Sequence, residues 1–298
     1  MDDAMEVARR LAAQRDEHRR ARDFAQADAL RDRIRELGYE VVDTPDGPDL
    51  RPAPEPLARE APALHRPARF GFSVHWLPQA WPEDVLRGIE AFRRHHPGHE
   101  IQHIVVQTEG PATAWPDDVE VVHPEEDPGF GGARNAGLQR AAGEIVVIAD
   151  GSVEPAGDVL TPLAEALADR SVGLAGPFGV VTDDLREFRE SPGPEVDAIE
   201  GYLMGFRRRV IADAGGFDEK FRFYRAADLD LSFRIRDRGL SAKVVDLPLT
   251  RHEHRMWSAT PEDERARLSK RNFYRFLDRW GSRHDLRVGR SPPPAGPA

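Results

Sequence analysis

The chain has 298 residues, and its 52 acidic and 42 basic side chains give a formal net charge of −10. This balance disfavours a protein that holds nucleic acid mainly through phosphate contacts, because such binding needs a clustered excess of Lys and Arg. Cysteine is absent, so disulfides and thiolate sites are excluded, and the oxygen or imidazole ligands that remain favour Mg²⁺ or Mn²⁺. With no apolar leader and no run of about 20 apolar residues, we expect a cytoplasmic protein.

The first part of the chain predicts a small helical module over residues 1–50. Residues 3–37 carry apolar side chains at helical spacing, as in one helix or a helical hairpin. Residues 39–42 form a strand-like run, and the Pro and Gly of residues 44–48 then favour a turn. Five prolines in residues 51–68 indicate an extended linker.

From residue 69 on, short apolar runs alternate with helical segments. That alternation predicts an α/β fold, in which helices flank a mainly parallel sheet. Ligands of such sheets bind outside the carboxyl ends of the strands, so Asp150, directly after an apolar run, should lie at a binding edge. The expected strands are residues 70–74, 101–106, 119–122 and 144–149, with a helix over 85–92 and another from Gly131.

A glycine-rich turn at residues 128–137 opens the second of these helices. Free N–H groups and the helix dipole favour an anion there, and Arg134 would add positive charge. The alternative is a tight turn that only begins a helix.

Two acidic segments complete the candidate site. Asp150, with Ser152 beside it, would hold a divalent cation against a diphosphate, or else cap the following loop. Asp228 and Asp230 fall in the first turn of a predicted helix, whose dipole favours their ionised form. An ionised carboxylate at a cleft can take a proton from an attacking hydroxyl, although both residues also suit simple helix-start acids.

Residues 70–280 resemble the family 2 inverting glycosyltransferases. The resemblance implies a Rossmann-like GT-A fold over residues 69–285, a nucleoside-diphosphate-sugar donor, and inversion at the anomeric carbon. The motifs occur in family order as Gly129-Phe130-Gly131, Ala133-Arg134-Asn135-Ala136-Gly137, a strand ending in Asp150, Gly205-Phe206-Arg207-Arg208, Gly215-Gly216-Phe217-Asp218 and Ala227-Asp228-Leu229-Asp230-Leu231-Ser232-Phe233-Arg234.

The same resemblance implies roles for single residues. Asp228 would be the catalytic base that deprotonates a glycan, lipid or small-molecule acceptor. The remaining roles are the donor and diphosphate contacts Gly131, Arg134, Asn135, Asp150 and Ser152, the Mg²⁺ or Mn²⁺ ligands Asp150, His252 and His254, and the acceptor-side residues Glu200, Gly201, Asp230 and Arg234.

Three positions depart from the family pattern. Gln107 stands where acidic residues usually hold the nucleotide base, Ser152 replaces the second metal-binding acid, and Ala227 replaces the Glu before the catalytic Asp. These departures keep a second hypothesis open, in which the chain is a catalytically degenerate binding or scaffold protein of the same fold.

Residues 21–32 and 38–48 resemble the C-terminal tail of cysteinyl-tRNA synthetases, which belongs to the anticodon-binding region of that family. Residues 1–50 hold 13 acidic and 9 basic side chains, which is a poor balance for an RNA binder. We therefore expect a docking or homo-oligomerising role for this module and no tRNA binding.

The last helical pattern places Phe273, Phe276, Leu277 and Trp280 on one face with basic residues between them. Such a helix either lies on the inner face of a membrane or packs on the transferase core, and we favour packing. Residues 286–298 are Pro-rich and are expected to form a disordered tail.

Overall fold

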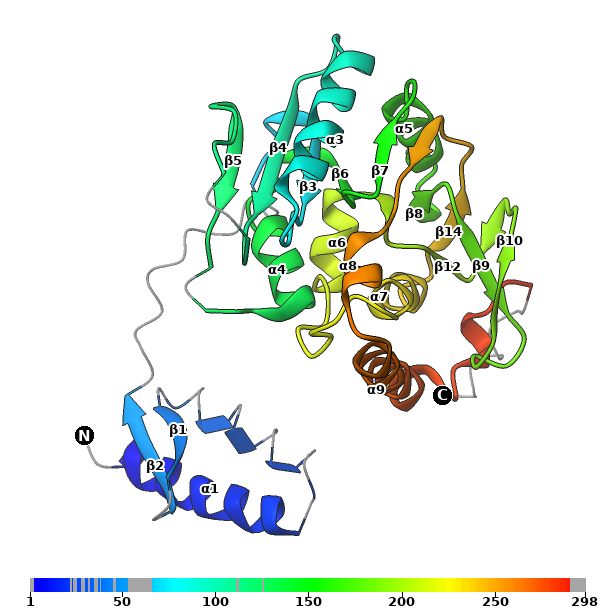
Figure 1. The fold of residues 1–298 in the computed structure, drawn as a ribbon. Helices are drawn as coiled ribbons and strands as arrows, with labels where there is room; N and C mark the ends of the chain where they lie inside the picture. Colours follow the sequence, from blue (N-terminus) through cyan, green and yellow to red (C-terminus); the bar gives the residue numbers. More distant parts are fainter. Residues whose placement is uncertain are drawn as a thin grey trace. The chain divides into compact units, whose positions relative to one another are not determined.

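The computed structural model of the chain describes residues 3–21, 23, 26–27, 30–31, 33–34, 37, 39–44, 47–52, 66–110, 113–124 and 126–289 (Figure 1). Contacts divide the chain into two compact units, Met1–Glu60 and Ala61–Ala298. The division falls within the predicted linker, of which residues 53–65 lie outside the described residues, as do residues 290–298 of the predicted tail.

The N-terminal unit combines helical segments with a β-hairpin: after the first helix, the described residues 26–27, 30–31 and 33–34 are also helical, within the predicted helical range. Helix α1 (Asp3–Arg20) is followed by β1 (Tyr39–Thr44) and β2 (Gly47–Pro52), which pair antiparallel. The sequence predicted the first strand but not the second, because two prolines and a glycine disfavour a strand and are tolerated only at an edge. A small apolar core joins the elements through Ala8, Ala12, Ile34 and Val41, with Leu11, Leu37, Tyr39 and Leu50 packed against it.

The second unit is built on a sheet of eight strands among the described residues, in the order β11-β14-β8-β13-β6-β3-β4-β5. Strands β6, β3, β4 and β5 run parallel, as do β8 and β14, whereas β13 is antiparallel to both its neighbours, β6 and β8. The strands are β3 (Phe70–Trp76), β4 (Ile101–Val106), β5 (Val119–Val122), β6 (Gly143–Ala149), β8 (Val172–Gly176), β11 (Glu195–Val196), β13 (Leu203–Arg207) and β14 (Ser241–Val244).

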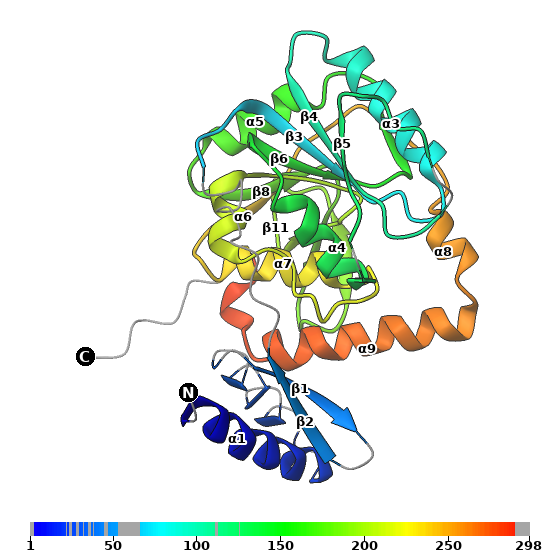
Figure 2. The same ribbon diagram turned by 90° about the vertical axis from the view of Figure 1, so that its left-hand side faces the viewer.

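Helices cover both faces of this sheet (Figure 2). Because successive side chains of a strand point to opposite faces, Ile145 and Val147 of β6 join one apolar core and Val146 and Ile148 join the other. The first core includes residues of α3 (Pro82–His95) and α5 (Leu160–Ala168). The second includes residues of α4 (Gly129–Leu138), α6 (Arg208–Ala214) and α7 (Ala227–Arg236).

Two smaller sheets lie beside the main one. Strands β9 (Gly179–Thr182), β10 (Phe188–Ser191) and β12 (Ala198–Ile199) form the first. In the second, β7 (Val153–Pro155) pairs antiparallel with β15 (Leu249–Arg251). This pairing brings the segment after β15 beside the loop after β6, where the His252 N–H donates to the Ser152 carbonyl at 2.7 Å.

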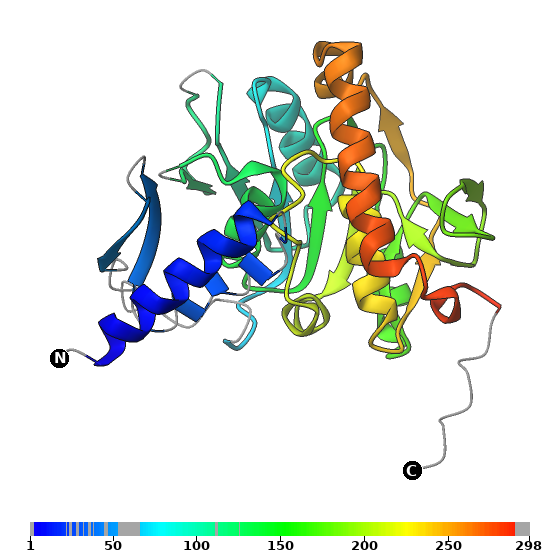
Figure 3. The ribbon, with the colours of Figure 1, turned by 90° about the horizontal axis from the view of Figure 1, so that it is seen from below.

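The C-terminal segment contains α8 (Arg255–Ala259), α9 (Glu262–Trp280) and η2 (His284–Leu286). Phe276 and Trp280 of α9, the long orange-to-red helix of Figure 3, are buried in the second core, which is the packing that we favoured over a membrane face. The packed chain continues past residue 285, since Leu286 is buried and the Val288 N–H donates to Asp197. Among the described helices, none is both long and apolar enough to span a bilayer.

One buried carboxylate connects α7 to α9. Asp230, 1% exposed, accepts from Arg234 Nε at 2.8 Å, from Arg279 Nη1 at 2.9 Å and from Trp280 Nε1 at 2.9 Å. Asp218 pairs with the same two arginines, so the guanidinium groups bridge two carboxylates. A buried charge that is fully hydrogen-bonded fixes the position of its partners and becomes costly when one partner is removed.

We expect Asp230→Ala to lower the free energy of unfolding by about 3 kcal/mol, because it leaves two arginines and an indole without their shared acceptor. Asp213→Ala is the matched control, since Asp213 and Arg209 form a surface pair at 3.8 Å with side chains 62% and 90% exposed. Its effect should stay below about 1 kcal/mol. Urea unfolding of both variants measures the difference, and equal losses would refute a structural role for Asp230.

Candidate active site

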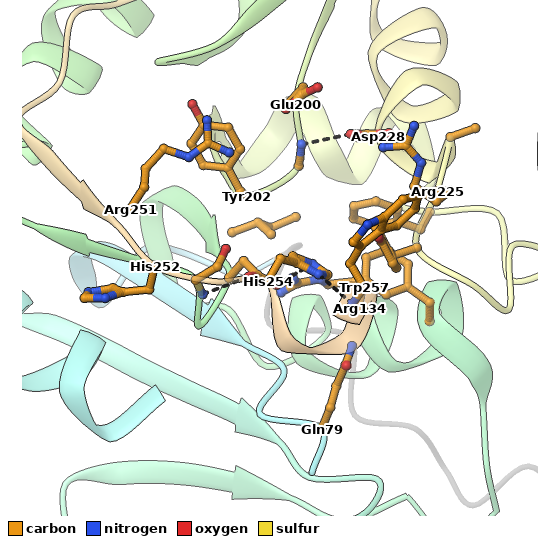
Figure 4. Close-up of a pocket in the computed structure, with 18 residues that line it drawn as sticks. Gln79, Arg134, Glu200, Tyr202, Arg225, Asp228, Arg251, His252, His254 and Trp257 are labelled. Atoms are coloured by element: carbon orange, nitrogen blue, oxygen red, sulfur yellow. Dashed lines mark hydrogen bonds and ion pairs between the residues drawn. The ribbon is translucent and has the colours of Figure 1, made fainter. Parts of the chain in front are cut away.

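A cavity of about 330 Å³ lies beyond the carboxyl ends of β3 and β6 (Figure 4). Segments far apart in the sequence meet there because β6 ends next to the start of β13, and the Asp150 N–H donates to the Tyr202 carbonyl at 2.9 Å. The lining residues are Gln79, Phe130, Arg134, Ile148, Asp150, Ser152, Glu200, Gly201, Tyr202, Phe217, Tyr224, Arg225, Ala226, Asp228, Arg251, His252, His254 and Trp257.

Asp228, the predicted base, lines this cavity from the first turn of α7. Its Oδ2 accepts from the Gly201 N–H and its Oδ1 from the Leu229 N–H, both at 2.9 Å. The fit against Gly201 is close, because a Cβ at that position would lie 3.1 Å from the Asp228 Cβ. Burial raises the pKa of Asp228 above its ordinary value of 3.8, against the lowering effect of these N–H donors.

Glu200 lies beside Asp228 at the same end of the cavity. Burial, followed by repulsion from the Asp228 carboxylate, raises the pKa of Glu200. Two neighbouring carboxyl groups with raised pKa values are one way in which a protein prepares a group to accept a proton near neutral pH. The predicted acceptor-side residues Glu200 and Gly201 therefore lie next to the predicted base.

The loop after β6 forms another wall of the cavity. Asp150 Oδ1 accepts from the Ser152 N–H at 2.9 Å, and Ser152 is itself buried. Beneath this loop lies Arg134, a guanidinium with 1% exposure whose Nη1 donates to the carbonyls of His75 at 3.3 Å and Ala149 at 3.5 Å. Burial lowers the pKa of Arg134 to about 10, and the nearby Asp150 carboxylate partly opposes that shift.

The predicted metal ligands do not all converge. His254 Nε2 lies 3.7 Å from Asp150 Oδ2, whereas His252 points away from both and lies 3.5 Å from a Glu154 oxygen (Figure 4). Ser152 offers only a hydroxyl where a second carboxylate would complete a cation site. Among the described residues, no group of three or more His, Asp or Glu side chains is arranged to hold a metal ion. The donor set therefore does not fit a hard divalent cation, which depends on several charged oxygen ligands.

Two residues predicted to bind the diphosphate have structural contacts instead. A Cβ on Gly131 would lie 2.4 Å from the Asp218 carbonyl oxygen, so Gly131 permits close packing of α4. The Asn135 amide binds the backbone of Phe217, donating to its carbonyl at 2.9 Å and accepting from its N–H at 2.8 Å. Neither residue lines the cavity.

The anion site expected at the start of α4 is also filled by the protein itself. The N–H groups of Phe130 and Gly131 donate to the carbonyls of Arg222 and Phe221. Asp230 and Arg234, predicted on the acceptor side, belong to the α7–α9 network and do not line the cavity. Each of these polar groups was predicted to bind a ligand, and each instead contacts a distant segment of the chain.

Several cavity residues were not predicted. Burial raises the pKa values of Tyr202 and Tyr224 to about 12, so both phenols stay protonated and can donate hydrogen bonds. Gln79 lines the cavity with a φ of 50°, a left-handed backbone conformation that is rare for residues other than glycine and often marks functional sites. Arg251 could have been found from its position directly before the two histidines, but Tyr202 and Gln79 carry no local signal.

We expect Asp228→Asn to become more stable relative to the parent protein as the pH rises. A carboxyl whose pKa is raised in the folded state favours folding below its unfolded pKa, and this contribution is lost as the pH rises through the folded value. The amide of the variant does not ionise, so it does not lose stability in this way. The melting temperature of the variant minus that of the parent should therefore increase from pH 4 towards neutrality. Thermal unfolding across this range, with Asp213→Asn as the control for removing one charge, measures it. A difference that does not change with pH would contradict a raised pKa for Asp228.

The sequence matches one known family in the region of the cavity. Residues 102–229 match the model of Glycosyl transferase family 2. A Drosophila melanogaster protein named putative inactive polypeptide N-acetylgalactosaminyltransferase 12 is 26% identical over 194 residues, which span 56% of this chain and 32% of the fly protein.

Solved structures show a similar fold. GalNAc-T7 with UDP, GalNAc and Mn²⁺ matches with a TM-score of 0.58 and 15% identity, over 72% of this chain and 49% of that one. The mannosyltransferase PcManGT from Pyrobaculum calidifontis, with GDP-Man and Mn²⁺, matches with a TM-score of 0.47 and 17% identity, over 76% and 75%. The chain thus spans less than half the length of the fly protein and of the GalNAc-T7 chain. The predicted fold class is confirmed: the second unit has a GT-A fold, with a mainly parallel sheet flanked by helices.

Proposed function

We propose that the chain transfers a sugar from a nucleoside-diphosphate sugar to an acceptor hydroxyl, with inversion at the anomeric carbon. The observation that carries this proposal is that Asp150 and Asp228, from distant segments, line one cavity at the carboxyl edge of the sheet. That edge is where open α/β sheets bind their ligands. The family match over residues 102–229 and the similar fold of GalNAc-T7, whose structure contains UDP, support a nucleotide-sugar donor.

In this proposal Asp228 is the general base of a single displacement. Its carboxylate takes the proton from the acceptor hydroxyl while the hydroxyl oxygen forms a bond to the anomeric carbon. The bond from that carbon to the diphosphate oxygen breaks, and the nucleoside diphosphate leaves with the electron pair. The raised pKa of Asp228 makes it a stronger base than a solvated aspartate, and Glu200 and Gly201 would contact the acceptor.

The donor would lie against the loop after β6. Asp150, Ser152 and Arg134 line this wall, and the leaving diphosphate gains negative charge as the glycosidic bond breaks. The buried Arg134 supplies fixed positive charge at this end of the cavity, where a low dielectric strengthens electrostatic interactions. The acceptor class stays open among glycans, lipids and small molecules.

A binding or scaffold protein on the same fold is the second candidate. Ser152 provides no second carboxylate, and Ala227 is a buried apolar residue directly before Asp228. Gln107 is the residue that would face a nucleotide base, and its Oε1 already accepts a hydrogen bond from the Trp115 indole at 2.9 Å. A protein that has lost catalysis could retain the cavity for binding alone.

The N-terminal unit adds a separate proposal. We infer a docking or homo-oligomerising role for the packed helix and hairpin, because their acidic balance is unfavourable for RNA. We also propose that the protein is cytoplasmic.

We expect the full chain to consume one nucleoside-diphosphate sugar of a panel, and Asp228→Asn to lose at least about 100-fold of that turnover, the usual contribution of a general base. Release of the nucleoside diphosphate measures turnover, and thermal shift measures donor binding. At about 100 times its Kd, a donor should stabilise both proteins by about 2.7 kcal/mol.

Asp213→Asn, a surface substitution with the same change in charge, should keep both turnover and binding. Full turnover by Asp228→Asn would overturn the proposed base. A parent protein that binds no member of the panel would argue against donor use, whereas binding without turnover, across acceptors of all three classes, would favour the second candidate.

A further inference from the structure

The cavity wall that faces the expected diphosphate lacks the ligands of a divalent cation. Asp150 is its one carboxylate, and one oxygen of that group already accepts from the Ser152 N–H. The guanidinium of Arg134, beneath the loop, attracts the same carboxylate electrostatically. A carboxylate with a fixed cation beside it attracts a mobile cation less strongly, since the two positive charges repel.

His254 is oriented unfavourably for metal binding. Its Nδ1 accepts from the Trp257 N–H at 3.1 Å, in the capping contact that begins α8. An imidazole that accepts at Nδ1 carries its proton on Nε2 when neutral, and Nε2 is the atom that faces Asp150. In that tautomer the Nε2 lone pair is not available to a metal, and a cation bound there would cost the Nδ1 contact, while the Trp257 N–H would keep the His254 carbonyl at 2.9 Å as its acceptor.

Arg251 offers a positive charge beside the same loop. Its backbone pairs with Val153 across β7 and β15, directly after the Asp150 loop. Its guanidinium carbon lies 4.5 Å from the centre of the Tyr202 ring and faces the cavity (Figure 4). The side chain makes no ion pair and no side-chain hydrogen bond with any described residue, so its five N–H donors are available to a ligand.

The other exposed arginine of the cavity has different neighbours. Arg225 stacks on Trp257 at 5.5 Å and lowers the pKa values of Asp228 and Glu200, and Arg251 lowers that of Glu200 as well. Arg251 differs from Arg225 in its backbone position, because it pairs with Val153 directly after the Asp150 loop and so lies beside the donor end as well. A planar guanidinium on an aromatic ring is well suited to phosphate oxygens, because it is always charged and can bind two oxygens at once.

We propose that this cavity binds a nucleoside diphosphate without a divalent cation, and that the Arg251 guanidinium provides the positive charge at the diphosphate that the cation would provide. This inference rests on the proposed use of a nucleoside-diphosphate-sugar donor. Under this inference Arg251 is a binding residue. The fixed positive charge of Arg134 then compensates the Asp150 carboxylate in the absence of a metal.

Isothermal titration of the full chain with UDP, GDP, ADP, CDP and TDP tests the inference, once with EDTA and once with Mn²⁺. We expect at least one of these nucleotides to bind in EDTA. Adding Mn²⁺ should change its Kd by less than about threefold, which is much less than the tenfold change that about 1.4 kcal/mol of binding free energy would produce. Arg251→Ala should weaken that binding by about 10- to 100-fold, the effect of losing hydrogen bonds to a charged group. Arg251→Lys should recover part of the loss.

Arg209→Ala is the matched control, because its side chain is 90% exposed on α6 and does not line the cavity. It should bind as the parent does, and circular dichroism would verify that each variant is folded. Binding only in Mn²⁺, or unchanged binding by folded Arg251→Ala, would overturn the inference while leaving the proposed donor intact. Absence of binding in both buffers would instead overturn the proposed function, and the inference with it.

Discussion

The antiparallel strand β13 is the constraint on which the candidate site depends. It lies between β6 and β8, which run parallel to each other as members of the sheet, so the chain must enter β13 at the edge where β6 ends. Two hydrogen bonds thereby fix this segment: the Asp150 N–H donates to the Tyr202 carbonyl, and the Gly201 N–H donates to the Asp228 carboxylate. Because the strand is buried on both faces, its backbone groups bond to β6 and β8 and not to water, which fixes the start of β13 beside the end of β6.

Charge compensation is the second organising feature. Burying a guanidinium such as that of Arg134 costs desolvation free energy. Three kinds of contact offset this cost: two carbonyl oxygens, the Phe130 ring at 5.3 Å and the Asp150 carboxylate. The arrangement sets a positive charge under one wall of the cavity, whereas the two carboxyl groups with raised pKa values occupy the other end. The cavity is therefore polarised, as a site that separates a leaving anion from a proton acceptor requires.

Sequence periodicity predicted the elements whose signals are local. The strands over 101–106 and 119–122 have the predicted bounds, since each is a short run rich in Ile and Val, the β-branched residues that favour strands. Strand β13 was not predicted, because its Leu-Met-Gly-Phe-Arg sequence is short, contains glycine and is stabilised by strands from other segments. The same reason limits prediction of the site: Asp150 and Asp228 follow from motif and position, whereas Tyr202 and Gln79 enter the cavity only through the tertiary fold.

Residues that carry the family resemblance divide into two physical groups, and the division bears on catalysis. Gly131, Asn135 and Asp230 hold segments of the fold together, so an active enzyme and an inactive descendant would need them equally. Their presence is evidence of the GT-A fold and says nothing about turnover. Asp228 is different, because its carboxyl group lines the cavity and has a raised pKa, although it also accepts hydrogen bonds from the Gly201 and Leu229 N–H groups. The question of turnover therefore depends on Asp150 and Asp228, which line the cavity, and not on the residues that hold the fold together.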